Sequence, residues 1–425
     1  MPAQFRVVIV GAGIGGLAAS IGFAQRGHSV TIVESSPSIR AVGSVLTIPA
    51  NSCKVLDSYG VLSAVQKRCV GDSPNSIWKR YTGEFIVTTD KWTEADTFGY
   101  KQTWLLEQMA RTSIPHYGSL SSRTDKISIG HKSRVRQLVG SLDVKIDDSL
   151  EISHVYLPLE TITSDPALAH LVGPATMWMG PGRVAMGIAL RRDTSDDIWV
   201  SEFAHRGMDG IVGDWGKSME VQLLKDMHTD FDADLTRILD KADSATVWKL
   251  VTVDALSHSW LSKSGKIALI GDAVHAMPPH FAQGAAMAVE DGASLAQCLS
   301  RASTTEEIPK ACQAWEQIRK PRVAFVQNIA TENSNMMMLP DGKGQQGRDM
   351  MFKSIRGQKD QGTWDGVHID EVPKSRKDPT FGAFIYGHDA IGFKEQARKQ
   401  ALTLGSYTQA KRKLDEVFPL VKNGA

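Results

Sequence analysis

The sequence of 425 residues has almost no net charge, no long apolar segment and little cysteine. Its 48 basic and 47 acidic residues give a formal net charge of +1, which excludes the strongly basic surface of proteins that bind nucleic acids or anionic membranes. No apolar run approaches the roughly 18 residues that a membrane span requires. Repeats and low-complexity tracts are absent too, so we expect an ordinary soluble globular protein with more than one substructure.

The four cysteines are also informative by what they do not form. Cys53, Cys69, Cys298 and Cys312 are scattered, without the spacing of a metal site or a disulfide framework. We therefore expect reduced thiols in a reducing compartment, the cytoplasm, and no bound metal. The first apolar run begins at Arg6. We therefore expect no signal or transit peptide before it.

The first 34 residues have the pattern of a βαβ unit. The apolar, β-branched run Arg6–Val10 predicts a strand that is buried on both faces. A glycine-rich turn follows it, and then residues 17–26 predict a helix. Residues 29–33 predict a second strand. This order of elements is typical of a domain that binds a dinucleotide.

The glycines stand where such a unit needs them. Gly11 permits the tight turn, Gly13 lets the backbone approach a pyrophosphate, and Gly16 allows close packing of helix and strand. The helix N-terminus offers free N–H groups and a partial positive charge to phosphates. Glu34, at the end of the second strand, can accept a hydrogen bond from a ribose 2′-OH. The acid favours FAD or NAD over tightly held NADP.

A second motif lies between residues 266 and 291. Its apolar start, Lys266–Ile270, predicts another buried strand, which places Asp272 just past the carboxyl end of that strand. Asp272 can bind a polyol there. After the stiff Pro278-Pro279 pair, Gln283 and Gly284 open a helix whose N-terminus can stabilise negative charge on a ring system. A flavin requires both functions. The alternative is that Asp272 only caps a turn.

The rest of the chain predicts a mixed α/β protein. Short alternating runs at 84–89, 183–190 and 198–203 suit an antiparallel sheet with one covered face. Helices are predicted at 52–59, 217–242, 283–301, 306–337 and 391–413, and a loop at 339–380. We predict an FAD-binding domain at 1–75, 100–152 and 255–338. A β-sheet substrate domain is predicted at 76–99 and 153–254, and a C-terminal loop and helix region at 339–425.

Several separated motifs resemble one family, the FAD-dependent aromatic monooxygenases of the salicylate-hydroxylase type (group A flavoprotein hydroxylases). The resemblance covers most of the chain and depends most heavily on Gly271–Gly284 with Glu290-Asp291. The other matching stretches are Val8–Ala19, Val42–Asn51, Trp178–Arg183, Leu339–Gly342 with Arg348-Asp349, and Tyr386–Asp389.

This resemblance implies a Rossmann-like FAD-binding domain of the para-hydroxybenzoate hydroxylase type, interleaved with the substrate domain. It implies that Gly11, Gly13, Gly16 and Glu34 hold the ADP half of FAD. The same resemblance puts the ribityl chain near Asp272 and the isoalloxazine near Pro279 and Gln283-Gly284. Such enzymes take a hydride from NADH or NADPH. They use O₂ to form a flavin C4a-hydroperoxide, which hydroxylates a phenolic, in some cases polyketide-derived, ring.

One stretch departs from the family pattern. Family members usually carry an Asp-Gly motif before a Ser-x-Val-Arg turn, but Ile129 stands where the Asp is expected. The segment before it is short, which indicates an internal deletion. Trp104–Arg111 resembles a helix remnant, and within this region Arg111 and Lys101 are the candidate flavin-binding cations. The chain can therefore be a mis-spliced enzyme, a homologue with weakened NAD(P)H use, or a protein repurposed for binding or a non-oxidative step.

The catalytic residues are predicted from the loop that faces the flavin. Pro279 lies in this loop, and His280 can serve as a phenol-activating base because an imidazole titrates near neutrality. His275 suits a structural role, as do the aromatic and methionine run around Trp178 and the triplet Met336–Met338. The expected partners are a small aromatic substrate and O₂, with neither nucleic acid nor membrane. The protein is expected to be a monomer or homodimer.

Overall fold

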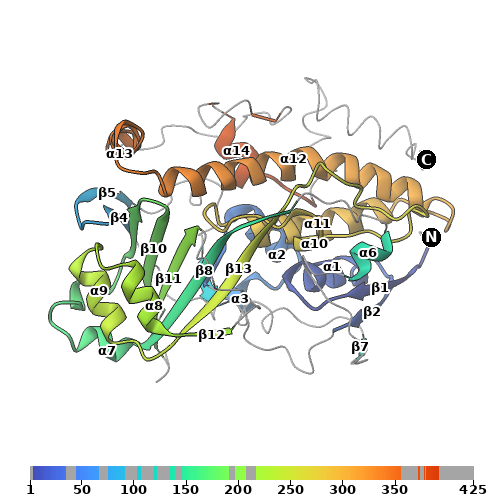
Figure 1. Cartoon of the computed structure of the whole chain (residues 1–425). Coiled ribbons are helices and arrows are strands. Elements are labelled where there is room, and N and C mark those ends of the chain that lie inside the picture. Colours follow the sequence, from blue (N-terminus) through green and yellow to red (C-terminus); the bar gives the residue numbers. More distant parts are fainter. Residues whose placement is uncertain are drawn as a thin grey trace.

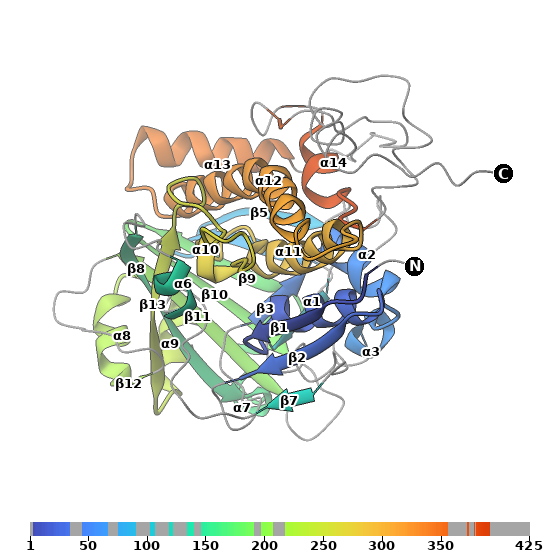
Figure 2. The same ribbon diagram turned by 90° about the vertical axis from the view of Figure 1, so that its right-hand side faces the viewer.

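The computed structural model describes residues 3–34, 45–66, 75–90, 103–106, 119–121, 134–139, 146–190, 197–206, 217–355, 372–373, 378 and 380–391. In this part of the chain the α/β fold class predicted from the sequence is confirmed. A small parallel sheet lies at one end of the molecule, a large and mostly antiparallel sheet lies at the other, and helices cover both (Figures 1 and 2). The predicted domain limits stay a prediction.

The small sheet contains the predicted βαβ unit. β1 (Arg6–Val10) and β2 (Ser29–Val33) pair in parallel and are joined by α1 (Ile14–Ala24). β7 (Ser119–Ser121) adds a third strand beside β2. Buried apolar residues of α1 pack against α11 (Gly284–Leu299). The two helices approach closely because Gly292 faces Ala19: a Cβ at Gly292 would lie 2.8 Å from the backbone of Ala19.

The large sheet has the order β12-β13-β8-β11-β10-β9-β4-β5. All neighbours in it are antiparallel except β4 and β9. Its strands are β4 (Asn75–Arg80), β5 (Phe85–Asp90), β8 (Ile146–Pro158), β9 (Ala175–Gly180), β10 (Arg183–Leu190), β11 (Ile198–Arg206), β12 (Lys217–Met219) and β13 (Ala245–Val253). β10 has the predicted bounds, and β5 and β11 overlap their predicted ranges closely.

Different helices pack on the two faces of the large sheet. Trp199 and Phe203 on β11 belong to a core that includes residues of α7 (Leu159–Thr163), α8 (Val221–Met227) and α9 (Ala233–Asp240). This outer face also has the 3₁₀ turn η2 (Ala169–Leu171). Because side chains alternate along a strand, Val200, Glu202 and Ala204 point to the opposite, inner face. Ala204 packs there against the end of α12 (Ile308–Met337).

Long helix α12 joins the two halves of the molecule. In Figure 1 it runs across the top of the molecule, above both halves. Trp315 and Val323 belong to the core around α1 and α11, whereas Met337, at the other end, is buried with the inner face of the large sheet. The structural role predicted for Met336–Met338 is thus confirmed for Met337 and Met338, which are both buried. The remaining helices are α2 (Ala50–Ser58), α3 (Leu62–Gln66), α6 (Arg134–Val139), α10 (Asp272–His275), α13 (Lys343–Ile355) and α14 (Phe381–Tyr386).

Four local predictions were wrong. Residues 266–270 form no strand: Leu269 N–H donates to Trp260 O at 2.9 Å, so the segment folds back on the chain before it. Residues 217–242 hold β12 and two helices, not one helix. Trp104 is in β6 (Thr103–Leu106), which pairs with β3 (Val45–Ile48), so the expected helix remnant begins as a strand.

The fourth error is α13, which lies within the predicted loop 339–380. Its two glycines lower helix propensity, but tertiary contacts override that preference. The Arg348 guanidinium donates to the carbonyl oxygens of Met336 and Met337, both at 3.2 Å, and Phe352 packs against Trp78. The helix predicted at 391–413 lies almost entirely outside the described residues.

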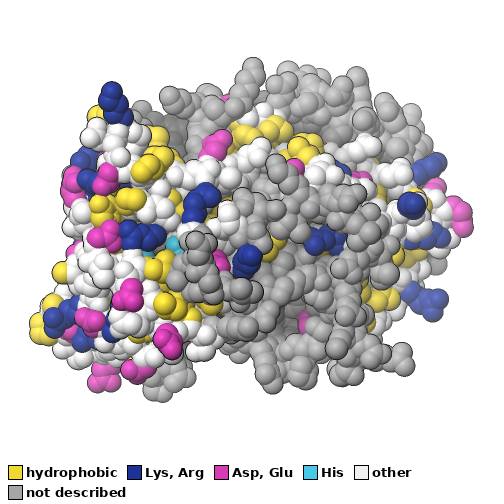
Figure 3. Space-filling view, viewed as in Figure 1, with side chains coloured by type: hydrophobic (Ala, Val, Ile, Leu, Met, Phe, Trp, Pro, Cys, Tyr) yellow, Lys and Arg dark blue, Asp and Glu magenta, His cyan; other side chains and the backbone are white. Residues whose placement is uncertain are grey.

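The described surface and thiols agree with the composition. On the face in Figure 3, basic and acidic side chains lie intermixed over the described surface. Among the helices of the described ranges, none is both long and apolar enough to cross a bilayer. Within the described ranges, Cys53, Cys298 and Cys312 are buried cysteines outside any disulfide, and burial raises the pKa of both Cys298 and Cys312 to about 12. Cys69 lies outside the described residues.

Two buried histidines in the half that holds the large sheet predict acid sensitivity. Burial lowers the pKa of His205 and of His228 to about 4, and the neutral His228 ring donates to Leu224 O at 2.8 Å. The unfolded chain binds these protons near pH 6.5, so stability falls as the pH drops below that value. Between pH 7 and pH 5.5 each histidine is expected to remove about 1 kcal/mol from the free energy of unfolding. Urea unfolding at both pH values tests this, and His228→Phe should flatten the pH dependence. An unchanged pH dependence in that variant would refute the assignment.

Candidate functional site

The turn after β1 has the geometry that a bound phosphate group requires. Gly11 adopts a φ of +113°, and its N–H donates to Val33 O at 2.7 Å. Gly16 lies so close to this turn that a Cβ on it would come within 2.0 Å of Gly11 O. Gly13 is the N-cap of α1 and provides no side chain to cap the helix. The first turn of α1 therefore presents backbone N–H groups.

Glu34 lies beside this turn, at the end of β2. Its Oε2 accepts a hydrogen bond from Ala12 N–H at 2.8 Å. The carboxylate is thus fixed next to the glycine turn, 22 residues away along the chain. The other carboxylate oxygen, Oε1, adds acceptor capacity at the place where the adenosine ribose of a dinucleotide binds in a βαβ unit.

The second motif folds around α10. Asp272 is exposed at the start of this short helix, after Gly271 with a φ of +61°. Asp291 fixes the position of this turn. Its Oδ2 accepts a hydrogen bond from Gly271 N–H at 3.0 Å and pairs with His275 Nε2 at 2.6 Å. His275 is fully buried against Trp260, which agrees with the structural role predicted for it. Asp272 itself is left at the surface of the turn.

Gln283 and Gly284 open α11 as predicted. Gln283 is only 1% exposed, and it follows Ala282, whose φ of +52° is unusual for a residue other than glycine. Its Oε1 accepts a hydrogen bond from Asn51 Nδ2 at 3.0 Å. Its Nε2 has no hydrogen-bond partner within the described residues, although the atom is buried. A buried donor without a partner is costly and needs an explanation.

The two motifs meet in space. A small cavity of about 10 Å³, room for roughly one water, is lined by Ile14 of α1 and by Ala285 and Ala286 of α11. Leu46, Thr47 and Ile48 of β3 form another wall. A Cβ on Gly15 would lie 3.0 Å from the Cβ of Ala288, so the first turn of α1 contacts the second turn of α11. Two helix N-termini therefore converge on one region.

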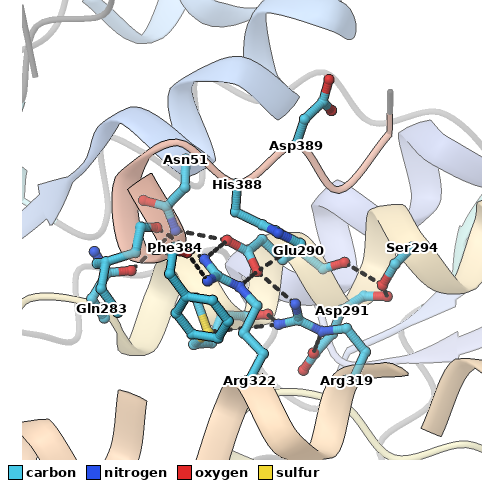
Figure 4. Close-up of polar contacts among 12 residues, drawn as sticks. Asn51, Gln283, Glu290, Asp291, Ser294, Arg319, Arg322, Phe384, His388 and Asp389 are labelled. Carbon is cyan, nitrogen blue, oxygen red and sulfur yellow. Dashed lines mark hydrogen bonds and ion pairs between the residues drawn. The ribbon is translucent and has the colours of Figure 1, made fainter. Parts of the chain in front are cut away.

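A buried network of charged side chains is linked to Gln283 through Asn51 (Figure 4). Arg322 donates to both oxygens of Glu290 at 2.7 Å, and Arg319 bridges Glu290 and Asp291 at 2.5 and 2.8 Å. All four side chains are at most 5% exposed. Burial alone would raise the pKa of the Glu290 carboxyl, but Arg322, His388 and Arg319 hold it well below its usual range. The carboxylate of Glu290 is therefore ionised at neutral pH.

The loop before α11 faces the inner side of the large sheet. Pro279 is exposed there, and His280 is half-buried, with its carbonyl oxygen accepting from Asn333 Nδ2 at 2.9 Å. Burial lowers the pKa of His280 to about 4. On β11, the negative charge of Glu202 raises this pKa and the positive charge of Arg206 lowers it further. The ring is thus neutral at pH 7. Its Nδ1 has no hydrogen-bond partner in the described ranges.

The inner face near His280 combines polar and apolar side chains. His154 Nε2 on β8 lies 3.3 Å from Glu202 Oε1 on β11, and the His154 ring stacks on Tyr156 with centroids 6.0 Å apart. Burial raises the pKa of Tyr156 to about 12, so its hydroxyl stays protonated. Beside these groups is an apolar cluster on the same sheet, made of Ala175, Ile188, Leu190 and Val200. These four apolar side chains are at most 1% exposed, whereas Tyr156 is 41% exposed, so Tyr156 is the part of this face that a ligand can reach.

Several residues singled out from the sequence either lie outside the described part of the chain or belong to the core and not to the candidate site. Arg111, Lys101 and Ile129 lie outside the described residues. Trp178 is fully buried in the outer core and donates to Asp232 Oδ2 at 2.9 Å, as expected of a core residue. Sequence reasoning missed Asn51 as a partner of Gln283. Asn51 ends one of the matching stretches, but nothing in the local pattern shows that it faces residue 283.

Comparisons with known proteins agree with this geometry. Two family models, each described as an FAD binding domain, match residues 6–51 and 220–330. The FAD-dependent monooxygenase ntnJ of Nectria sp is 25% identical over 87% of this chain and 96% of its own length. The 6-hydroxynicotinate 3-monooxygenase of Pseudomonas fluorescens is 24% identical over 77% of this chain and 91% of its own.

Solved structures show the same fold. CtdE in complex with FAD and a substrate has a TM-score of 0.73 at 19% identity, covering 96% of this chain and 99% of that chain. A salicylate hydroxylase substrate complex has a TM-score of 0.67 at 16% identity, covering 83% and 93%. The predicted resemblance to FAD-dependent monooxygenases with a salicylate-hydroxylase fold is thereby confirmed.

The residues present fit FAD. The glycine turn and the N-terminus of α1 offer donors for a diphosphate, and Glu34 offers an acceptor for a ribose. Asp272 is exposed for a polyol chain. The unpartnered, buried Gln283 Nε2 supplies a donor at the start of α11, where a flavin ring offers acceptors. This set combines donors for phosphate and ring with acceptors for sugar hydroxyls.

Proposed function

We propose that this chain is an FAD-dependent monooxygenase that hydroxylates a small aromatic or phenolic substrate, in some cases polyketide-derived, with NADH or NADPH and O₂. The observation that carries the proposal is the convergence of the α1 and α11 N-termini next to the buried, unpartnered amide of Gln283. The relatives named monooxygenases support the reaction class, and 6-hydroxynicotinate 3-monooxygenase supports an aromatic substrate.

Bound FAD supplies hydride acceptance and O₂ activation, and the protein supplies binding, orientation and protons. Gly11, Gly13 and Gly16 admit the diphosphate to the α1 N-terminus, while Glu34 holds the adenosine ribose. Asp272 accepts from ribityl hydroxyls. Gln283 and Gly284, at the positive end of α11, stabilise negative charge on the ring system. We keep Arg111 as a proposed further flavin-binding cation.

The substrate side is assigned to the inner face of the large sheet. We propose that the ring binds on this face next to Tyr156, which is 41% exposed, with Pro279 at its edge. His280 is neutral at pH 7, and its Nδ1 has no other partner among the described residues. We propose that it accepts the proton of a phenolic hydroxyl, which increases the electron density of the ring; its pKa of about 4 makes it a weaker base than the near-neutral imidazole expected from the sequence. Glu202 and the protonated Tyr156 hydroxyl lie on the same face.

A panel of hydroxyarenes tests this function. With bound FAD, oxidation of NADH or NADPH should accelerate when the right phenol is added. His280→Gln should lower kcat about 100-fold because the proton acceptor is lost, with FAD affinity unchanged. The matched control is His170→Gln, since His170 is 55% exposed and pairs with Asp234 on the outer helices. FAD-loaded protein that oxidises neither nucleotide with any phenol would favour the alternative, a homologue that has lost oxygenase activity.

Two finer expectations belong to the same proposal. The three buried cysteines outside any disulfide favour a reducing, cytoplasmic setting. The domain limits proposed from the sequence assign residues 1–75, 100–152 and 255–338 to FAD binding, and residues 76–99 and 153–254 to the substrate.

A further inference from the structure

The orientation of one carboxamide decides what Gln283 can do. Its oxygen accepts hydrogen bonds and its nitrogen donates them, so the two ends of the group recognise opposite ligand atoms. One end points toward Asn51 at 3.0 Å, and the other end has no partner in the described part of the chain. Whichever atom is turned away from Asn51 is the one that remains for another partner.

Asn51 fixes this orientation because its own amide is fixed. Its Nδ2 lies 2.7 Å from Glu290 Oε1 and 3.0 Å from Gln283 Oε1 (Figure 4). An ionised carboxylate only accepts hydrogen bonds, so the atom of Asn51 that meets Glu290 must be the NH₂ group. The second hydrogen of this NH₂ group then points at Gln283, so the Gln283 atom that accepts it must be the amide oxygen.

Glu290 stays ionised because of the helix behind it. Arg322 donates to its two oxygens from Nε and Nη2, and Arg319 donates to it from Nη1. These contacts are fully buried, where a charge-assisted pair with two hydrogen bonds is strong and its geometry is well defined. Arg322 is held in turn by the carbonyl oxygens of Phe384 and Ile385. The charge state of Glu290 thus sets the orientation of two amides in series.

We infer that Asn51 and Glu290 are positioning residues that turn the Gln283 NH₂ group toward the flavin ring, where it donates to a ring acceptor. This inference depends on the proposed FAD binding. The recognised class of atom is an acceptor: a carbonyl oxygen or an unprotonated ring nitrogen accepts from the NH₂ group, whereas a ring N–H does not satisfy it.

A double-mutant cycle on FAD affinity tests the series arrangement. Asn51→Leu and Gln283→Leu are each expected to weaken the Kd for FAD about 10-fold, the loss of one buried hydrogen bond. The double variant should bind no more weakly than either single variant, because Asn51 acts only through Gln283. Flavin fluorescence during titration of the FAD-free protein measures the Kd. Gln283→Glu, which keeps the shape but removes the donor, should lose at least as much affinity.

The matched control is Ser294→Ala. Ser294 is buried on the same helix and bonds Trp315 Nε1 at 3.1 Å, so this variant should lower stability and leave the Kd for FAD unchanged. A double variant about 100-fold weaker than the wild type would show independent effects and overturn the inference. So would a Gln283→Glu variant that binds FAD as tightly as the wild type. If the wild-type protein binds no FAD, the proposed function itself fails.

Discussion

Replacing Arg322 by methionine is expected to lower the free energy of unfolding by about 3–5 kcal/mol. The guanidinium is 5% exposed and binds Glu290, which is fully buried. Methionine fills similar volume but leaves Glu290 with less compensation for its lost hydration. The carbonyl oxygens of Phe384 and Ile385 lose their donor as well, which frees α14 from α12.

Urea unfolding at neutral pH measures this loss. The control is Lys225→Met, which removes a surface pair with Asp240 at 3.3 Å, where Asp240 is 72% exposed. Such pairs contribute about 0–1 kcal/mol, so the control should stay near the wild type. Equal stability of the two variants would mean that the buried network does not hold α11, α12 and α14 together.

Gly16→Ala is expected to weaken FAD binding about 100-fold or more, which corresponds to about 3 kcal/mol. The new Cβ would lie 2.0 Å from Gly11 O, a backbone atom that cannot move without opening the turn. The α1 N-terminus would then shift away from the glycine turn at which we propose that the diphosphate binds. The effect acts on the ADP half of the site and leaves Gln283 in place.

Gly347→Ala is the matched control for this variant. Gly347 lies in α13, and a Cβ there would meet no atom within 4 Å. The control should bind FAD like the wild type and gain a little stability, because alanine favours a helix more than glycine does. Both Kd values come from the same fluorescence titration. Wild-type affinity in Gly16→Ala would show that FAD does not use this turn.

The sequence predicted the parts of the fold that local patterns determine. The βαβ unit around Gly11 follows from an apolar run, a glycine turn and a second apolar run, all within 34 residues. The opening of α11 after Gln283 and the bounds of β10 follow from equally local patterns. These elements satisfy most of their backbone groups among near neighbours, so their sequences predict them directly.

Specific contacts, which the apolar pattern and helix propensity do not show, decided the elements that were mispredicted. The run 266–270 is as apolar as a strand, yet its backbone pairs with the nearby residues 260–262 and forms no part of a sheet. Helix α13 forms despite two glycines because Arg348 binds the carbonyl oxygens of Met336 and Met337 and Phe352 packs against Trp78, which is far away along the chain. Neither the pairing partner of an apolar run nor the partner of an aromatic ring follows from the pattern of the segment itself.

The residues of the candidate site also fall into those that the sequence predicts and one that it does not. Gly11, Glu34 and Gln283 stand out because motifs of known spacing contain them. Asn51 does not, since its role comes from Glu290, 239 residues later, and from two arginines on α12. Only the folded chain shows that an ionised carboxylate sets the orientation of both amides.

The central claim is that this chain inserts oxygen from O₂ into an aromatic ring with FAD. Incubation of the FAD-loaded protein with NADH and NADPH and a hydroxyarene panel under ¹⁸O₂, followed by mass spectrometry, tests it most directly. The account predicts a hydroxylated product that carries one ¹⁸O atom, and no label when ¹⁸O is supplied only in water. A product without label from O₂, or nucleotide oxidation that releases only hydrogen peroxide with every phenol, would contradict it.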